Sequence, residues 1–471
     1  MKKRFALILA TLMFMLLVAC NEKTNNDNNS IDNTDDVGIN NDSIDNDNNN
    51  TTETGNTDKI DSESVSIGLE YTLSKDGTYY IVTGVGTCED KNIVISSQHN
   101  GIPVKSIGES AFAKNGSINS VYIPLGITSI EDCAFLYCSN LNNISIPESV
   151  NYIGSYVFGG CKLNYNESNE LLYLGGKDNP YLYLAGSKNR DINNPSINDR
   201  CKFIGHSAFY VTENLTKITI PESVISIGQA AFAYCKKLTD VKIGENVKII
   251  SDGAFEHCES LSSITIPNSV EVIDSAAFMY CENLIDVELG TGIVTIGSSA
   301  FYKCNLSCTE KGNLKYIGNN SNPYLFLVGA ISDDITAAVI DENCEFIGSN
   351  AFDSCSNLTS IVIPKHIRSI GSFSFQKCDN LKTIEIPESV VVIDAYAFYK
   401  CTNLEKVIIP SSVITIERYA FEECSCLQNI EYSGTIEEWE NIFKGTDWNA
   451  DVPALKVITL DGDVFLVSDF K

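Results

Sequence analysis

A 23-residue repeat constrains the fold of this 471-residue chain more than any other feature. An isoleucine recurs at this spacing, as at Ile250, Ile273 and Ile296, and a phenylalanine always stands five positions after it. A unit of this length cannot bury its apolar side alone, so successive units must stack and bury it against their neighbours. The repeat therefore predicts a solenoid. The twelve phenylalanines are Phe112, Phe135, Phe158, Phe209, Phe232, Phe255, Phe278, Phe301, Phe352, Phe375, Phe398 and Phe421.

Each repeat also contains a Leu-x-x-Ile-x-Ile segment, for example residues 261–266. The alternation of apolar and polar residues at its end is typical of a half-buried β-strand. We expect these strands to align as a parallel sheet on one face of the solenoid. The Ile-Gly-x-x-Ala-Phe segments should form short turns or helices on the other face.

Two of the gaps between successive isoleucines are 51 residues long, which is 28 more than the repeat. Both contain an Asn-Pro-Tyr-Leu motif, at residues 179–182 and 322–325, an offset of 143 in the numbering. This offset indicates that a block of five repeats with one insertion was duplicated. Within the first insertion, residues 171–174 and 181–184 flank glycines and Asn-Pro, a pattern that predicts a β-hairpin. We expect two 28-residue hairpin insertions that project from one rim of the array.

Both ends of the array need caps, because a terminal repeat would otherwise expose its core to water. We predict an N-terminal β cap at residues 66–103, in which Lys75-Asp76-Gly77 turns a hairpin. The solenoid itself should span residues 104–432. A C-terminal cap should cover residues 433–471.

The C-terminal cap contains Thr435 and Glu438 at the spacing of a helix capping box. We expect the helix that begins there to carry Trp439 and Phe443. Trp439 and Trp448 are the only tryptophans of the chain. They could form an aromatic platform for a ligand, but a hydrophobic lid on the last repeat is the favoured interpretation.

The first 20 residues are typical of a lipoprotein signal peptide. Three basic residues precede an apolar run, and Leu17-Val18-Ala19-Cys20 resembles a bacterial lipobox, whose cysteine is lipidated. Residues 21–65 contain 13 Asn and have a net charge of −10, with too few apolar residues to form a core. We interpret them as a disordered acidic tether between a lipid anchor at Cys20 and the folded body. The expected location is extracytoplasmic, at the cell membrane or cell surface.

The repeat I-x-x-I-G-x-x-A-F-x-x-C-x-x-L-x-x-I-x-I-P-x-S-V resembles the BspA-like leucine-rich-repeat family of bacterial surface proteins, over about residues 66–471. The resemblance implies a leucine-rich-repeat solenoid, display at the cell surface, and binding or adhesion to other proteins. It implies no known catalytic site. Departures from the pattern are local: Asn115 and Thr212 stand in place of cysteine, and Val157 and Ser374 in place of alanine.

The chain has 17 cysteines, of which ten stand three positions after a repeat phenylalanine. Equivalent residues of stacked repeats lie side by side and point the same way, whereas a disulfide needs specific directions. There is also no Cys-x-x-Cys pair to favour zinc. We therefore predict a column of buried thiols, and assign no role to Cys88 or Cys133. The ten are Cys138, Cys161, Cys235, Cys258, Cys281, Cys304, Cys355, Cys378, Cys401 and Cys424.

The net charge of −28 repels nucleic acid phosphates, so no nucleic acid partner is expected. The four histidines, His99, His206, His257 and His366, form no metal or catalytic motif, and His206 and His257 resemble ordinary residues of the turn surface. We therefore predict a protein that is not an enzyme, with no catalytic residue, cofactor or metal. Two alternatives stay open. A carboxylate pair in a groove would favour a polysaccharide-acting enzyme, and a ligand-free structural spacer is also possible.

The predicted binding face consists of the residue between the last two apolar positions of each strand. Apolar groups stand there at Tyr122, Val362 and Ile408, although core packing does not require them. They could form a contact surface, or they could simply suit a strand. The expected partner is an extracellular protein or glycan, and the chain is expected to be a monomer. The predicted face comprises Tyr122, Thr219, Lys242, Thr265, Glu288, Val362, Glu385 and Ile408, with Ser145 and Glu431 at equivalent positions.

Overall fold

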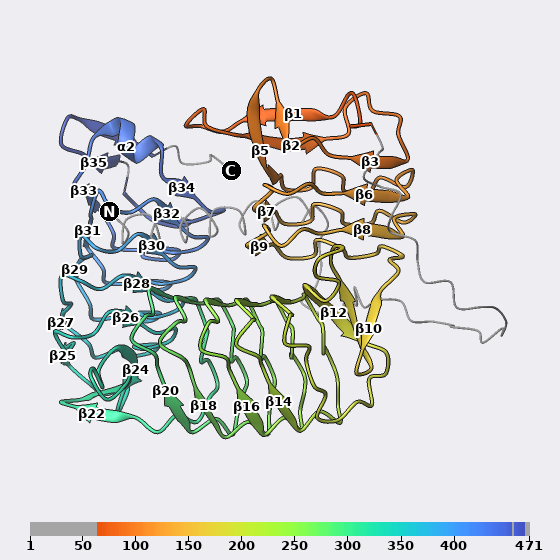
Figure 1. Cartoon of the computed structure of the whole chain (residues 1–471). Coiled ribbons are helices and arrows are strands. Elements are labelled where there is room, and N and C mark those ends of the chain that lie inside the picture. Colours follow the sequence, from red (N-terminus) through yellow and green to blue (C-terminus); the bar gives the residue numbers. More distant parts are fainter. Residues whose placement is uncertain (1–63, 455, 467–471) are drawn as a thin grey trace. The chain divides into compact units, whose positions relative to one another are not determined.

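The computed structural model describes residues 64–454 and 456–466 (Figure 1). They fall into two compact units that divide between Cys235 and Lys236, here called the first unit and the second unit. Both units consist of short β-strands joined by turns, and α2 (Ile436–Glu440) is the single helix among the described residues. Each unit is therefore a β-solenoid, as the 23-residue repeat predicts.

Most strands are two or three residues long, because each side of a repeat has room for only a few extended residues. The first unit contains β1 (Glu70–Leu73), β2 (Tyr80–Gly84), β3 (Asn92–Val94), β4 (Gln98–His99), β5 (Ile102–Ile107), β6 (Ser120–Tyr122), β7 (Ser129–Ile130), β8 (Asn143–Ser145), β9 (Tyr152–Ile153), β10 (Asn166–Ser168), β11 (Leu171–Leu174), β12 (Tyr183–Ser187), β13 (Phe203–Ile204), β14 (Lys217–Thr219) and β15 (Ser226–Ile227). The second unit contains β16 (Asp240–Lys242), β17 (Ile249–Ile250), β18 (Ser263–Thr265), β19 (Val272–Ile273), β20 (Asp286–Glu288), β21 (Thr295–Ile296), β22 (Thr309–Lys311), β23 (Leu314–Ile317), β24 (Phe326–Ala330), β25 (Ala337–Val339), β26 (Phe346–Ile347), β27 (Ser360–Val362), β28 (Ser369–Ile370), β29 (Thr383–Glu385), β30 (Val392–Ile393), β31 (Lys406–Ile409), β32 (Thr415–Ile416), β33 (Asn429–Tyr432), β34 (Phe443–Lys444), β35 (Lys456–Ile458) and β36 (Asp463–Phe465).

The predicted Leu-x-x-Ile-x-Ile strands form parallel sheets, which we call the front ladder (β3, β6, β8, β14, β16, β18, β20, β25, β27, β29, β31, β33 and β35). Paired residues are usually one repeat apart, as in Ile264↔Val287 and Ile384↔Val407. Along β29, Thr383 and Glu385 are exposed and Ile384 is buried. This alternation confirms that the front ladder has one buried and one solvent-facing side.

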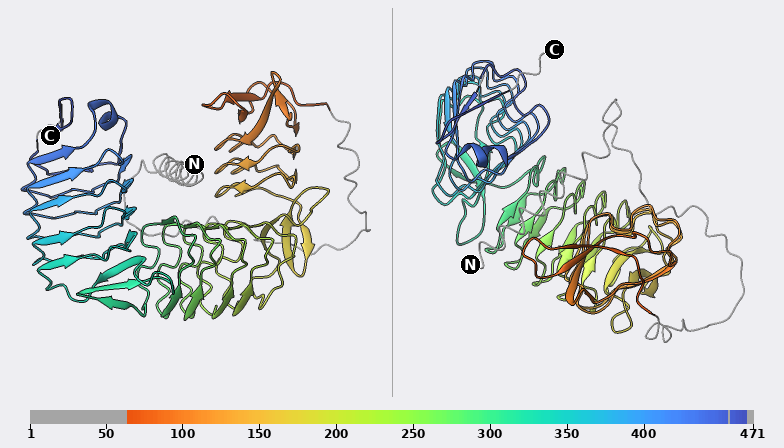
Figure 2. Two further views of the ribbon diagram at one scale, coloured as in Figure 1. Left: turned by 60° about the vertical axis from the view of Figure 1, so that its left-hand side comes forward. Right: turned by 90° about the horizontal axis from the view of Figure 1, so that it is seen from above.

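A second set of parallel strands, which the sequence did not predict, lies on the opposite side of each repeat. We call it the back ladder; it includes β5, β7 and β9 in the first unit and β24, β26, β28, β30, β32 and β34 in the second. Apart from β34, its two-residue strands end at the repeat isoleucine, so that Ile370 pairs with Ile393. The Ala-Phe segments that follow are turns rather than helices, and Figure 2 shows how the strands of successive repeats stack.

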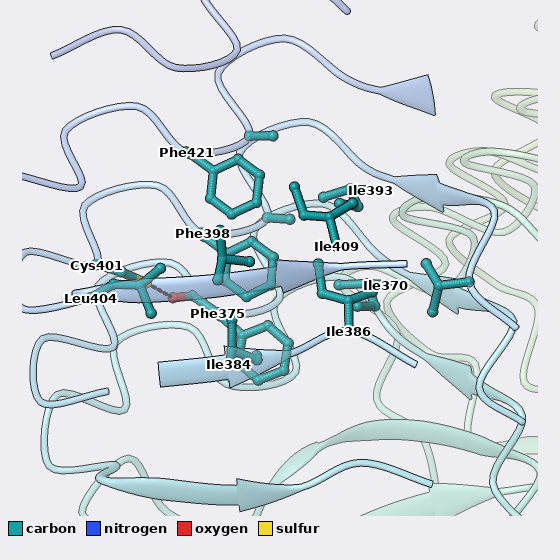
Figure 3. Packing of buried hydrophobic residues seen from close by; sticks show 14 of the residues in the cluster. Ile370, Phe375, Ile384, Ile386, Ile393, Phe398, Cys401, Leu404, Ile409 and Phe421 are labelled. Atoms are coloured by element: carbon teal, nitrogen blue, oxygen red, sulfur yellow. Dashed lines mark hydrogen bonds between the residues drawn. The ribbon is translucent and has the colours of Figure 1, made fainter. Parts of the chain in front are cut away.

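The repeat phenylalanines form the centre of the core. Phe375, Phe398 and Phe421 are fully buried, and their rings stack in near-parallel planes with centroids 5.2 and 5.1 Å apart (Figure 3). The same stacking joins Phe112 to Phe135 at 5.1 Å in the first unit. Each ring thus contacts the repeat on either side, which explains why the phenylalanine spacing predicts the solenoid.

The predicted column of thiols has a hydrogen-bonding role. Cys401 Sγ donates to Phe375 O at 3.0 Å, and seven other repeat cysteines make the equivalent bond to the phenylalanine of the preceding repeat, at 3.0 to 3.3 Å. A buried carbonyl oxygen is costly to leave unpaired, so a small side chain with a weak donor suits this position. Burial raises the pKa of the Cys235 thiol to about 12, which keeps it protonated. All sixteen cysteines among the described residues are free thiols.

The two insertions form the predicted hairpins but do not project from the rim. In the first insertion β11 pairs with β12 in antiparallel fashion, and β12 then pairs in parallel with β13, through Tyr183↔Phe203. The second insertion repeats this arrangement through Phe326↔Phe346. Tyr183 and Phe326 are buried and contact the phenylalanine column edge-on, with centroids 5.3 and 5.7 Å from Phe158 and Phe301. The hairpin therefore belongs to the back ladder, because its apolar residues extend the core.

Hairpins and aromatic residues close the two ends. At the N-terminal end β1 and β2 form the predicted antiparallel hairpin, with Gly77 at φ +72° in its turn. At the C-terminal end Thr435 and Glu438 form the predicted capping box. Helix α2 ends at Glu440, so the prediction that it carries Phe443 is wrong. Phe443 lies in β34 and continues the back ladder by pairing with β32.

The two tryptophans belong to this C-terminal segment, and both are buried. The indole ring of Trp448 contacts Phe421 edge-on at 6.2 Å and Trp439 at 5.9 Å. Trp439 also packs against Tyr432 at 5.2 Å. Rings enclosed in this way cover the last phenylalanine of the column. Their burial supports the interpretation as a hydrophobic lid rather than as a platform for a ligand.

Candidate functional site

The predicted binding face occupies the third residue of the front-ladder strands. Thr219, Lys242, Thr265, Glu288, Val362 and Glu385 are exposed there, whereas Tyr122 and Ile408 are partly buried. Neighbouring members lie in register within a sheet, since Thr265 pairs with Glu288. Glu385 pairs with Ile408, and Ile408 with Glu431. The structure thus brings the predicted residues of each sheet into one outward-facing row.

This row contains an apolar patch of two valines, of which the sequence predicted only Val362. Val362 is 58% exposed, and Val339, its partner in the register of β25 and β27, is 68% exposed. Val339 was missed because β25 follows the second insertion, where the repeat spacing is interrupted. Its signal is in the sequence nonetheless, since Val339 stands one repeat length before Val362.

Polar side chains surround a shallow hollow of about 250 Å³ elsewhere on the same row. Thr265 and Glu288 line it from the front ladder, and residues 319–321 of the second insertion form its opposite wall. The sequence predicted the first two residues. It could not predict the hollow, which needs the insertion to lie beside β20.

All four histidines have neighbours in the fold, with His257 stacked on Tyr280 and His366 in contact with Glu342 O. His99 stacks on Tyr71 with centroids 4.2 Å apart. His206 lies 3.9 Å from the ring of Tyr156, and burial lowers the pKa of the His206 imidazole to about 4. His206 and His257 both lie in turns and are partly exposed, as the sequence predicts for residues of the turn surface. No group of three or more His, Cys, Asp and Glu residues within 64–454 and 456–466 is placed to hold a metal ion.

Two acidic residues one repeat apart, Asp394 and Glu417, directly follow the back-ladder strands β30 and β32. Burial and, to a smaller extent, the neighbouring Glu417 carboxylate raise the pKa of Asp394 to about 8. Asp394 is 8% exposed. A group so enclosed is poorly placed to reach a polymeric substrate, and neither carboxylate lies on the front ladder.

Of the remaining predicted positions, Cys88 and Cys133 lie within the part of the chain that the structure describes, and Cys20 does not. Cys20 and the tether up to residue 63 lie outside the described part. Cys88 is buried and Cys133 is partly buried at φ +57°, and neither lies in the thiol column. No helix in residues 64–454 and 456–466 is long and apolar enough to cross a membrane.

A family model described as a BspA-type leucine-rich-repeat region matches the sequence in six copies, over residues 87–173, 202–324 and 331–449. These ranges include all twelve phenylalanines of the column, whereas β12 and β24 lie outside them. No curated protein sequence is significantly similar to the chain.

Solved structures of other repeat proteins are also similar to the chain. A leucine-rich cell-surface protein from Faecalibacterium prausnitzii is 26% identical, covering 81% of this chain and 97% of that one, with a TM-score of 0.28. A leucine-rich-repeat protein from Bacteroides ovatus is 24% identical, with coverage of 84% and 100% and a TM-score of 0.28. The pneumococcal vaccine antigen PcpA is 17% identical, with coverage of 86% and 89% and a TM-score of 0.31.

Proposed function

Because the chain belongs to the BspA-type leucine-rich-repeat family, we propose that it is a lipid-anchored surface protein that binds a partner protein through its front ladder. Repeat proteins of this kind offer extended surfaces whose outward residues are free to vary. The protein acts as a scaffold for binding or adhesion and performs no catalysis. The extracytoplasmic location and the anchor at Cys20 rest on the lipobox in residues 17–20.

Val339 and Val362 carry the proposal for the binding surface. They lie side by side in the register of β25 and β27, and both are more than half exposed. When a partner covers an exposed apolar group, the free energy falls by about 25 cal/mol for each Å² of apolar surface removed from water. The core does not use these two side chains, so their apolar character is available for binding.

Capture of extracellular proteins by the mature chain tests the binding surface. We expect a partner that is retained by the wild type to be lost when Val339 and Val362 are both changed to Asp. Leu125→Asp is the matched control, because Leu125 is equally exposed but lies in the first unit. Equal capture by all three proteins would refute the assignment of the surface.

The anchor has its own test. Cys20→Ser should move the protein from the detergent phase to the aqueous phase in a phase-partition assay, because an acyl chain contributes about 0.8 kcal/mol per buried CH₂. An unchanged fraction in the detergent phase would show that Cys20 does not carry the anchor.

A further inference from the structure

The hollow between the front ladder and the second insertion has walls that are held in place. Asn320 Nδ2 donates to Glu288 Oε1 at 3.3 Å, and thereby joins the insertion to β20. Leu289 N donates to Gly318 O at 3.0 Å and makes a second connection. The insertion turn is itself fixed, because Asn319 Oδ1 accepts hydrogen bonds from Ser321 N and Asn322 N, both at 2.9 Å. A site with prearranged walls loses little entropy on binding.

The polar groups of the hollow include both donors and acceptors. Asn268 Oδ1 accepts from Thr291 N at 2.9 Å and from Thr291 Oγ1 at 3.1 Å, which leaves the amide N–H groups of Asn268 to donate. Glu288 contributes carboxylate oxygens, which only accept. Thr265 lies beside Glu288 in the register and adds a hydroxyl group, which both donates and accepts.

These properties exclude several classes of ligand. Glu245 and Glu288 in the lining, with the net charge of −28, repel an anion. An apolar ligand would leave the carboxylate and amides without water or hydrogen bonds. An ammonium group has donors but no acceptor, so it could not use the N–H groups of Asn268. A ligand with several hydroxyl groups satisfies donors and acceptors together.

The fold does not require these side chains. The earlier of the two duplicated blocks has the same insertion, with Tyr122 in place of Thr265, Ser145 in place of Glu288 and Lys177 in place of Asn320. The hollow of about 250 Å³ is smaller than the roughly 300–1,000 Å³ typical of pockets for larger ligands. We propose that this hollow binds one neutral sugar ring of a glycan, with Glu288, Asn320 and Asn268 as the side chains that bind its hydroxyl groups.

Saturation-transfer NMR on the mature chain, with the methyl glycosides of glucose, galactose, mannose and N-acetylglucosamine as probes, tests this site. We expect at least one glycoside to bind, and expect Glu288→Ala and Asn320→Ala each to weaken its binding by about tenfold, the effect of losing one hydrogen bond to a charged or fixed group. Glu288→Gln should retain part of the affinity, because its amide oxygen still accepts.

Glu388→Ala is the matched control, since Glu388 is an exposed carboxylate outside both the hollow and the front-ladder row. It should leave binding unchanged. The proposal is overturned if none of the four glycosides binds, if both alanine variants bind like the wild type, or if only Nα-acetyl-lysine methylamide binds there. The site is separate from Val339 and Val362, so loss of protein capture in those variants would not affect this result.

Discussion

In the first insertion the Tyr173 hydroxyl accepts a hydrogen bond from Asn198 N at 3.0 Å, and in the second the Tyr316 hydroxyl accepts one from Asp341 N at 3.1 Å. Both tyrosines are fully buried. The two insertions also end the phenylalanine column in the same way, with an edge-on aromatic ring. The interiors of the two insertions thus make the same contacts.

The solvent-facing sides of the two blocks differ. After the first insertion the front ladder is polar and borders a shallow hollow of about 260 Å³. After the second it is largely apolar, although the backbone pairing is equivalent, with Ser196↔Thr219 in one block and Val339↔Val362 in the other. The equivalent residues of the two blocks are Asn194 and Ala337, Ser196 and Val339, Lys217 and Ser360, and Thr219 and Val362.

This contrast shows which positions packing controls. A buried side chain is surrounded by others at close-packed density, so a change of size costs stability. An outward residue on a strand changes stability little and can be altered for binding. Differences between the blocks therefore indicate where function resides, and the similarities indicate what holds the fold.

The largest expected effect concerns the shared interior. Phe255 and Phe398 occupy equivalent positions in the two blocks, and both are fully buried in the phenylalanine column. Changing either one to Ala should lower the free energy of unfolding by about 3–5 kcal/mol, because a cavity remains in the core. Chemical denaturation measures both variants, with the exposed Glu385→Ala as control. A loss below about 1 kcal/mol at one site would show that the two interiors are not equivalent.

The next effect, a dependence of stability on pH, is expected in the second block alone. Asp394 occurs there at the position that Ser251 has in the first block. Asp394 has a folded-state pKa of about 8, above the value of about 3.9 for an unfolded aspartate. The folded state therefore holds the extra proton between these pH values, and its stability falls as pH rises through about 8, by up to about 1.4 kcal/mol per pH unit.

Asp394→Asn should remove this pH dependence, which amounts to about 2 kcal/mol between pH 6 and pH 8. Denaturation curves of the chain at both pH values measure it. Glu385→Gln changes an exposed carboxylate and should leave the dependence intact. If the wild type is equally stable at both pH values, Asp394 is not protonated in the folded chain.

A smaller effect should again be equal in the two blocks. Tyr173→Phe and Tyr316→Phe each remove the acceptor of one backbone N–H group, at Asn198 and Asp341. Each substitution should cost about 1–2 kcal/mol, since a buried donor loses its partner. Thermal unfolding of the two variants provides the comparison. If the two substitutions differ in cost by more than about 2 kcal/mol, the two insertions are not equivalent.

The smallest change in stability should accompany a large change in binding. Replacing Val339 by Ser and Val362 by Thr gives the second block the residues of the first. Stability should change by no more than about 0.5 kcal/mol, because both side chains are exposed. Capture of a partner protein should nonetheless be lost. A strong loss of stability would mean that the valines serve the fold rather than a partner.

The sequence alone determined the features that recur at a fixed spacing. The phenylalanine column and the front-ladder strands can be read from the repeat length, and the duplication from the offset between its two blocks. The Thr435–Glu438 capping box could also be predicted, because its two partners are neighbours in the chain. Such features depend on local pattern or on stacking of identical units, so one rule applies to every repeat.

The tertiary structure decided the rest. Most back-ladder strands are two residues long, too short for any alternation to predict them. Tyr396 and Lys400 have positive φ values, and each donates its backbone N–H to a carbonyl of the next repeat. The hairpin of each insertion could have projected from the rim. It joins the back ladder because Tyr183 and Phe326 can bury their rings only against the end of the phenylalanine column. The hollow at Glu288 follows from that placement, since its second wall comes from residues that no repeat spacing places beside β20.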